Sequence, residues 1–206
     1  MPIRTSDLLQ RAGGLAAGAG AGAGAANPAH AADLPADLPA DLPPDPLADP
    51  LDAALAAPGL ARFADLSVQV GTPVEVGAVG HGVRRLIPIL GGTCTARDWS
   101  ARVLGGGADF QLIVNERMAR LEARYVLETD AGDRIYVQND AVRTATAEVM
   151  ARLVRGEAVD PALVYFRCVP RFEVASPALA WLTERLFLGT GVRRPTDVLM
   201  RFFEVQ

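Results

Sequence analysis

From Leu60 to the C terminus, the sequence consists of short apolar runs that alternate with polar residues and are separated by Gly, Pro and Asp. Such alternation is typical of a β-strand with one face in a core, because successive side chains of a strand point to opposite faces. In residues 119–129, Leu121 and Tyr125 fall on one face and Glu122 and Arg124 on the other. The pattern predicts strands at residues 61–70, 84–90, 99–104, 109–114, 119–129, 133–139, 163–174, 185–190 and 197–205.

Two segments of the same region have helical features instead. Residues 144–157 carry apolar side chains four positions apart, a threonine at 144 or 146 that can cap a helix, and Gly156 as a stop. A shorter helical turn is predicted at 177–183, where Pro177 suits the first helical position and Ser176 can cap it.

About nine strands in one domain cannot remain a flat sheet without leaving exposed edges. We therefore expect an all-β fold with one or two short helices: a single antiparallel β-barrel with a calycin-like interior, in preference to a two-sheet sandwich. A barrel of this size can enclose a cavity for one small ligand.

The N-terminal residues 1–31 have the features of a signal peptide. Arg4 and Arg11 precede a run of Ala, Gly and Leu that ends in Ala29-His30-Ala31, a small-x-small cleavage pattern. The segment resembles a twin-arginine leader in which Thr and Ser replace the arginine pair, and it is too weakly apolar for a membrane span. It predicts an exported protein, periplasmic or extracellular. The alternative is a disordered Ala/Gly tail on a cytoplasmic protein.

Residues 32–58 begin with the repeat "ADLPADLPADLPPDPLADPLD" and contain no basic residue before the barrel region. Proline removes backbone donors and the spaced aspartates repel one another, so we expect an extended linker. The predicted barrel domain then spans residues 59–206.

Charge and residue usage exclude several classes of function. All 20 basic residues are Arg, against 24 acidic residues, and no stretch is densely basic, so nucleic acid is not an expected partner. Without Lys there is neither Schiff-base chemistry nor a P-loop. His81 is the only histidine after the leader, so a multi-histidine zinc site is excluded, and we predict neither a metal nor a cofactor. Cys94 and Cys168 form either one disulfide or two buried thiols, and we favour thiols.

The stretch "RLFLGTGVRRP" at 185–195 has two glycines and an arginine pair that suggest a phosphate loop. The glycines lack the following Lys-Ser/Thr and helix, so we interpret Gly189-Thr190-Gly191 as a strand connection in which glycine supplies positive φ or close approach. Arg193 would then lie at the rim of the barrel, facing either an anionic ligand or a surface carboxylate.

The candidate catalytic residue is Asp109, which starts an apolar strand after Gly105–Gly107. If buried among apolar groups it would have a raised pKa and serve as a general acid or base; beside Arg it would stay charged and fix the fold. The candidate ligand-binding residues share a position in or beside an apolar strand and a cationic or aromatic side chain; they are Arg84, Arg85, Tyr136, Arg167, Trp181 and Arg193.

Several motifs in one order resemble a known family. These are "RRLIPILGG", "ARVLGGGADFQLI", "DRIYVQN", "VYFRCVPRFEV", "AWLTERLFLGTG" and "RFFEV", and together they are similar to the bacterial proteins called UPF0311 or DUF3237 over roughly residues 60–205. The resemblance implies an antiparallel β-barrel whose general biochemical role is not settled.

Three functions are compatible with these observations. The first is a barrel that binds a small organic acid or apolar anion in its interior. The second is a cofactor-independent enzyme, an isomerase, cyclase or lactone-opening enzyme, in which Asp109 moves a proton. The third is a structural or assembly protein of the cell envelope. Binding and catalysis both require Asp109 and Arg167 to share one cavity. Whether the chain forms a homo-oligomer stays open.

Overall fold

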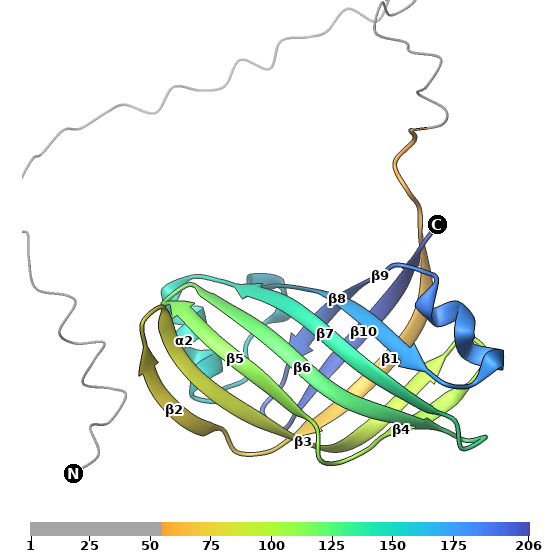
Figure 1. Cartoon of the computed structure of the whole chain (residues 1–206). Helices are drawn as coiled ribbons and strands as arrows, with labels where there is room; N and C mark the ends of the chain where they lie inside the picture. The colour runs from red at the N-terminus through yellow and green to blue at the C-terminus, as the bar shows by residue number, and fades with distance from the viewer. Residues whose placement is uncertain (1–54) are drawn as a thin grey trace, which may run out of the picture. The chain divides into compact units, whose positions relative to one another are not determined.

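The computed structural model describes residues 55–206, which form a closed antiparallel β-barrel (Figure 1). The expected leader at 1–31, and the linker up to residue 54, lie outside the described residues. The strands are β1 (Leu60–Val70), β2 (Val74–Val79), β3 (Gly82–Ala96), β4 (Ser100–Val103), β5 (Ala108–Asn115), β6 (Met118–Thr129), β7 (Arg134–Thr144), β8 (Tyr165–Val174), β9 (Phe187–Arg193) and β10 (Asp197–Val205). The helical elements are α2 (Ala147–Val154), η1 (Pro161–Leu163) and η2 (Pro177–Thr183).

The ring of strands closes through β1, which pairs with both β10 and β3. Leu66 illustrates this closure, because it lies opposite Met200 on one side and Cys94 on the other. The order continues from β10 through β9, β8, β7 and β6, and both β4 and β5 bridge β6 to β3. Strand β2 pairs with β3 as an addition to the ring. Closure removes the exposed strand edges that a flat sheet of this length would have, and it confirms the predicted fold class.

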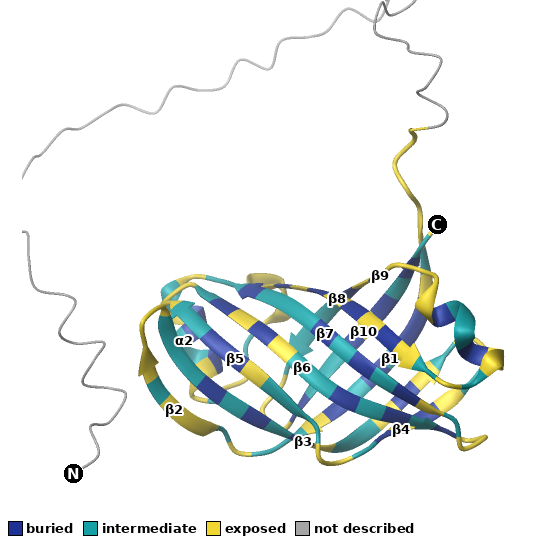
Figure 2. Ribbon diagram, viewed as in Figure 1, coloured by how far each residue is buried: buried dark blue, intermediate teal, exposed yellow. Residues whose placement is uncertain are grey.

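Buried and exposed residues alternate along most strands of the ring (Figure 2). In β8, Phe166, Cys168 and Phe172 are buried, whereas Tyr165 and Arg167 are exposed. The sequence alternation therefore decides which residues reach the barrel interior.

Helical elements lie at both ends of the barrel, α2 at the left and the blue turn of η2 at the right of Figure 1. At the η2 end, Trp181 packs against Phe63 with ring centroids 5.6 Å apart, and Phe63 packs against Phe187 at 4.9 Å. At the α2 end, Met150 and Leu153 pack with Leu121 and other apolar residues of the wall. Each end thus has its own apolar cluster, and polar interior groups lie between them.

The helix α2 begins three residues later than the sequence predicted, because β7 continues to Thr144. The Thr146 hydroxyl accepts a hydrogen bond from the Val149 N–H at 3.3 Å, which selects Thr146 over Thr144 as the cap. At the predicted turn η2, Ser176 occupies the cap position but makes no side-chain capping hydrogen bond. Strand β2 was not predicted, since its run "VEVGAV" is mostly exposed and lacks a buried face.

The glycines of "GTG" are part of strand β9, so the prediction of a strand connection was wrong. Their role is close approach: a Cβ on Gly189 would lie 2.6 Å from the Cys168 sulfur, and one on Gly191 would lie 2.6 Å from the Phe166 ring. Glycine lets β9 lie against the large side chains of β8 in the barrel interior. A connection was predicted because glycine usually marks a turn.

Candidate functional site

A small cavity of about 50 Å³ lies in the barrel interior. It lies between α2 and the aromatic cluster formed by Phe63, Trp181 and Phe187. Its walls include apolar residues of β1, β3, β6 and β10. Its polar lining consists of Asp109, Gln111, Tyr125, Asn139, Arg143 and Arg193. Such a mixture of apolar walls and a few convergent polar groups is typical of a small-molecule site.

A hydrogen-bonded chain of side chains holds Asp109 in place. The Arg85 Nε donates to Gln111 Oε1 at 3.0 Å, and Gln111 Nε2 donates to Asp109 Oδ2 at 2.5 Å. The other carboxylate oxygen accepts from the Glu122 backbone N–H at 3.0 Å. Asp109 and Gln111 are two residues apart on β5, which places them on the same face. The carboxylate is therefore fixed on both of its oxygens.

The pKa of Asp109 is raised because burial disfavours its charged form. The hydrogen bond from Gln111, the charge of Arg143, the Glu122 N–H and the charge of Arg85 each act in the opposite direction. The sequence left two possibilities for Asp109, burial among apolar groups or a position beside arginines. Both are present in the structure, and burial has the larger effect on its pKa.

The side chain of Arg143 is the largest polar group buried in the barrel, with 1% of its surface exposed. It projects from β7 opposite Ala119 of β6, whose small side chain leaves room for it. Within residues 55–206, its Nε and Nη2 atoms have no hydrogen-bond partner. Burial, together with the charges of Arg85 and Arg193, lowers the pKa of Arg143 to about 10, so the guanidinium stays charged at neutral pH.

Arg143 is the least compensated of the three arginines in or beside the cavity. Arg85, Arg143 and Arg193 each have a lowered pKa, with burial as the main cause, and the charge of Asp109 raises all three. The charge of Asp197 also raises the pKa of Arg193, and Glu75, 4.0 Å from Arg85, raises that of Arg85, whereas Asp109 is the carboxylate that acts on Arg143. A ligand that adds a negative charge would improve this balance.

Two further polar groups of the cavity are unpartnered. The Tyr125 hydroxyl and the Asn139 Oδ1 atom are buried and have no hydrogen-bond partner in the described part of the chain. Asn139 Nδ2 contacts the Met200 sulfur at 3.6 Å. Burial and the nearby thiols of Cys94 and Cys168 raise the pKa of Tyr125 well above its usual value, so its phenol is neutral.

The two cysteines are buried and free in the described barrel, as we favoured from the sequence. Burial is the main reason that the pKa of each thiol is raised to about 12. Neither thiol is therefore a nucleophile at neutral pH.

The structure brings together only three of the residues singled out from the sequence. Asp109 and Arg193 line the cavity, and Arg85 reaches it through Gln111. Arg84 donates to the Phe110 carbonyl at 3.3 Å in an exposed position. Tyr136 follows buried Ile135 on β7 and has the opposite, outward orientation.

Trp181 lies in the aromatic cluster at the η2 end, with Phe63 and Phe187, and is not part of the cavity lining. The guanidinium of Arg97 lies 5.8 Å from its ring centroid. Trp181 therefore contributes to the closed end of the barrel.

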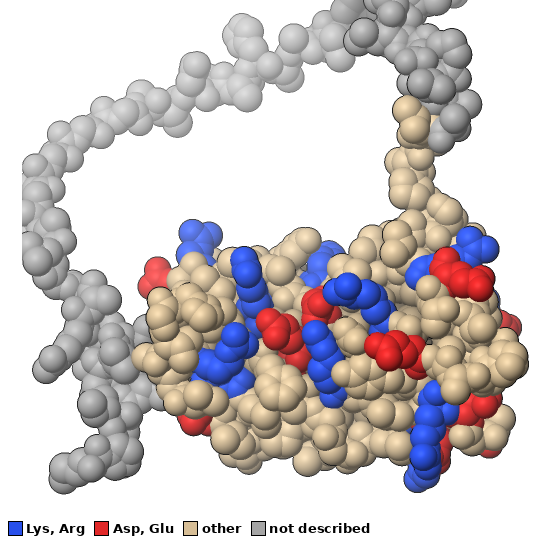
Figure 3. Space-filling view, in the orientation of Figure 1, with Lys and Arg blue, Asp and Glu red and all other residues tan. Residues whose placement is uncertain are grey.

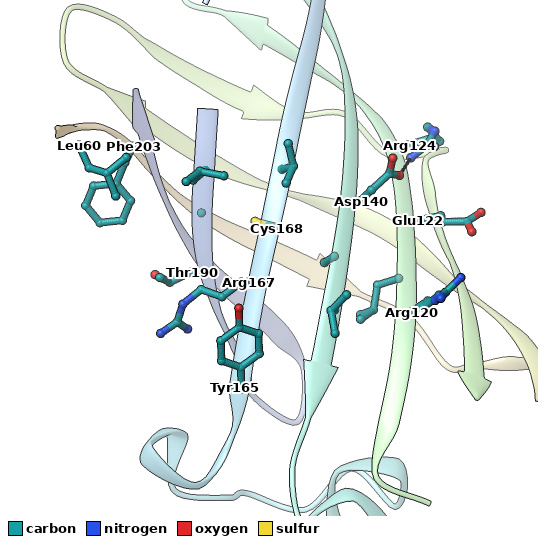
Figure 4. A pocket seen from close by; sticks show the side chains of 16 residues that line it. Leu60, Arg120, Glu122, Arg124, Asp140, Tyr165, Arg167, Cys168, Thr190 and Phe203 are labelled. Carbon is teal, nitrogen blue, oxygen red and sulfur yellow. Dashed lines mark hydrogen bonds and ion pairs between the residues drawn. The ribbon is translucent and has the colours of Figure 1, made fainter. Parts of the chain in front are cut away.

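Arg167 lies on the outer face of the barrel, in a groove of about 880 Å³ (Figure 4). Its guanidinium lies 4.9 Å from the Tyr165 ring centroid, and its Nη1 donates to the Phe166 carbonyl at 3.0 Å. The expectation that Asp109 and Arg167 share a cavity is therefore wrong, because the two side chains lie on opposite sides of the wall. The sequence predicted that Tyr165 and Arg167 lie on one face of their strand, and they do, but that face is the outer one.

One carboxylate of the outer groove, Asp140, is already paired with two arginines. Asp140 accepts from Arg124 at 2.8 Å and from Arg171 at 2.9 Å. Acidic and basic side chains alternate over this side of the molecule (Figure 3). Arg120, Glu122 and Arg167 also line the groove, but they are exposed to water, where single charges contribute little. The inner cavity is therefore the better candidate site.

Sequence reasoning missed Arg143, Gln111, Tyr125 and Asn139. For Arg143 a signal was available: residues 135, 137, 139, 141 and 143 alternate onto one face of β7. The predicted strand stopped at residue 139, and the predicted helix began at 144, so Arg143 was assigned to a loop.

Two further observations concern metal ligands and membrane-spanning helices. In residues 55–206, no three His, Cys, Asp or Glu side chains gather as a metal site would require. Over the same residues, no helix is both long and apolar enough to cross a membrane.

Comparison with known proteins places the chain in a family. The family described as "Protein of unknown function (DUF3237)" matches residues 58–205. A UPF0311 protein of Rhodopseudomonas palustris is 41% identical over 140 residues, covering 68% of this chain and 92% of the relative. A crystal structure of a conserved protein of unknown function from R. palustris has a TM-score of 0.69 at 37% identity, over 73% of this chain and 99% of that one. A β-barrel-like protein of Acinetobacter baumannii has a TM-score of 0.64 at 34% identity, over 72% and 96%. The chain belongs to the DUF3237 family, whose curated relatives carry the name UPF0311.

Proposed function

We propose that the barrel binds a small organic acid in its interior, with the carboxylate on Arg143. The observation that carries this proposal is the pair of unpartnered donors on Arg143, Nε and Nη2. These two N–H groups lie along one edge of the planar guanidinium, where they can donate two parallel hydrogen bonds to a carboxylate.

The charge around the cavity supports an anionic ligand. Arg143 and Arg193 line it, and Asp109 is the carboxylate that offsets the charge of Arg143. Burying an isolated cation without a partner is unfavourable, so a bound carboxylate would relieve a cost that the folded barrel carries.

The test is calorimetric titration of the full chain with acetate, propionate, glycolate and lactate, using the wild type and two variants. Arg143→Gln removes the guanidinium with its two unpartnered N–H groups (the Arg143 fork), and Arg167→Gln is the matched control on the outer face. We expect the wild type and the control to bind alike, and Arg143→Gln to bind about 10- to 100-fold more weakly. Equal affinity of all three proteins, or no binding by any, would overturn the proposal.

A second candidate function is a proton-transfer enzyme without a cofactor. It is favoured by Asp109, a cavity-lining carboxyl group with a raised pKa beside a cation, as general acid–base catalysis requires. NMR of lactones and hydroxy acids incubated with the protein for hours tests it. If the wild type turns a compound over, and Asp109→Asn loses the turnover but still binds acids, Asp109 is catalytic. If the wild type binds acids without turnover, the protein is a binding protein and not an enzyme for these compounds.

We further propose that the chain is exported, on the basis of Arg4, Arg11 and the Ala29-His30-Ala31 pattern. Mass spectrometry of the protein from its native host gives the mature N terminus. Cleavage after Ala31 is expected, and a chain that retains residues 1–31 would contradict export by this signal.

A further inference from the structure

Arg85 determines the orientation of the Gln111 side-chain amide. The guanidinium of Arg85 has only N–H donors, so the Gln111 atom that faces its Nε at 3.0 Å must be the carbonyl oxygen Oε1. The amide nitrogen Nε2 is then turned to Asp109 Oδ2, 2.5 Å away. Arg85 and Gln111 are both buried, and Glu75 of β2 lies 4.0 Å from the Arg85 Nη1 atom. Only one orientation of the amide therefore satisfies both of its neighbours.

Asp109 consequently receives hydrogen bonds from two groups that can only donate. Gln111 Nε2 binds one carboxylate oxygen, and the Glu122 backbone N–H binds the other at 3.0 Å. These bonds favour the ionised carboxylate, because neither donor can accept the proton of a carboxylic acid. Each carboxylate oxygen has a second lone pair, which can accept a proton from a ligand in the cavity.

The charges that act on Asp109 come from other strands of the ring. Arg143 of β7 and Arg85 of β3 favour its ionised form, and Asp109 in turn raises the pKa of Arg193 at the end of β9. Four contributions oppose the effect of burial on the pKa of Asp109, and the hydrogen bond from Gln111 is the largest while the charge of Arg85 is the smallest. Arg85 therefore acts on Asp109 mainly by orienting the amide.

We propose that Arg85 and Gln111 are positioning residues that make Asp109 the proton acceptor of the cavity. Arg85 fixes the amide, the amide nitrogen keeps the carboxylate ionised, and a free lone pair of Asp109 takes the proton of the ligand. The bonding electron pair stays on the ligand, and the arginines that line the cavity favour the resulting negative charge. This inference rests on the second candidate function, proton transfer at Asp109, and assigns that residue the role of base.

The test follows the Asp109 carboxyl carbon by ¹³C NMR as a function of pH. It uses the full chain refolded from denaturant without ligand, and the absence of the signal in Asp109→Asn assigns it. Gln111→Met removes the hydrogen bond and nearly keeps the side-chain length, so the pKa of Asp109 should rise by about 1–2 pH units. Arg85→Met should raise it by a similar amount, because the released amide can turn Oε1 toward a protonated Asp109.

Arg84→Met is the matched control for the loss of an arginine from β3. Arg84 is the neighbour of Arg85 but lies in an exposed position, where it donates to the Phe110 carbonyl. This variant should leave the pKa of Asp109 unchanged.

A second measurement uses only the wild type. The side-chain amide signal of Gln111 in ¹⁵N NMR should move with pH along the same curve as the Asp109 carbon, because its Nε2 is bonded to that carboxylate. The amide of Asn139 also lines the cavity but contacts the Met200 sulfur, so its signal should move much less.

An unchanged pKa of Asp109 in Gln111→Met, or a Gln111 amide signal that does not follow the Asp109 titration, would overturn the inference. A rise in Gln111→Met without a rise in Arg85→Met would overturn the role of Arg85. These outcomes are independent of binding and turnover. If the expected changes are found but no compound is turned over, the second candidate function fails and the positioning of Asp109 by Arg85 and Gln111 stands.

Discussion

Replacing Arg143 with methionine should make the ligand-free protein more stable. Arg143 is buried, yet two of its donors lack partners in the part of the chain that the structure describes. A buried donor without a partner costs about 1–3 kcal/mol. Methionine fills much of the same volume without a charge or a donor.

Two electrostatic changes act on this gain in opposite directions. The variant loses the attraction between Arg143 and Asp109, but Asp109 already has a raised pKa and can take up a proton. It also loses the repulsion between Arg143 and the charges of Arg85 and Arg193. We therefore expect the free energy of unfolding to rise by about 1–3 kcal/mol. At roughly 2–4 °C per kcal/mol for a domain of this size, Tm should rise by about 2–12 °C.

The assay is thermal and urea unfolding of protein refolded from denaturant, which removes bound acids. Arg85→Met is the matched control, because Arg85 is also buried but its Nε is bonded to Gln111. That variant leaves Gln111 Oε1 without its donor and should lose about 1–3 kcal/mol of stability. If Arg143→Met lowers Tm as Arg85→Met does, Arg143 is a structural residue and the argument for a ligand fork fails.

Three further predictions concern other parts of the barrel. The pKa of Asp109 is raised above 3.8 in the folded protein, so the folded state binds a proton that the unfolded state has lost. The stability of the wild type should therefore fall, relative to that of Asp109→Asn, as pH rises from about 3.8 through the raised pKa. Urea unfolding at several pH values tests this, and parallel stability curves of the two proteins would contradict it. Cys94 and Cys168, with pKa values of about 12, should resist alkylation at pH 8 until the protein unfolds, and rapid labelling of the native protein would refute their burial. Gly191→Ala places a Cβ 2.6 Å from the Phe166 ring and should lower the free energy of unfolding in urea by about 1–3 kcal/mol. An unchanged urea midpoint would show that β8 and β9 can move apart.

Local patterns in the sequence were enough to predict most of the barrel. Nine of the ten strands were anticipated, because each has a buried face and therefore an alternating sequence. The exception, β2, is largely exposed and packs only along β3, so no alternation marks it. The extension of β7 to Thr144 was missed because polar Asn139 and Arg143 interrupt its apolar face.

The candidate site was only partly predictable, since alternation assigns a residue to a face without saying which face is inside. Arg85 and Arg167 illustrate this limit: both are arginines in apolar strands, but Arg85 points into the barrel and Arg167 outward. Which face of a strand is interior depends on the side chains of its neighbours in the closed ring.

The sequence by itself determined the strand pattern, the two short helices and the absence of lysine chemistry. Those properties depend on local periodicity and composition, which can be read along the chain. Only the tertiary structure decided that Asp109, Tyr125, Asn139 and Arg143 meet in one cavity, and that the Arg143 fork has no partner within residues 55–206. Closure of the ring brings together residues from strands far apart in sequence, and whether a buried group is partnered depends on every strand around it.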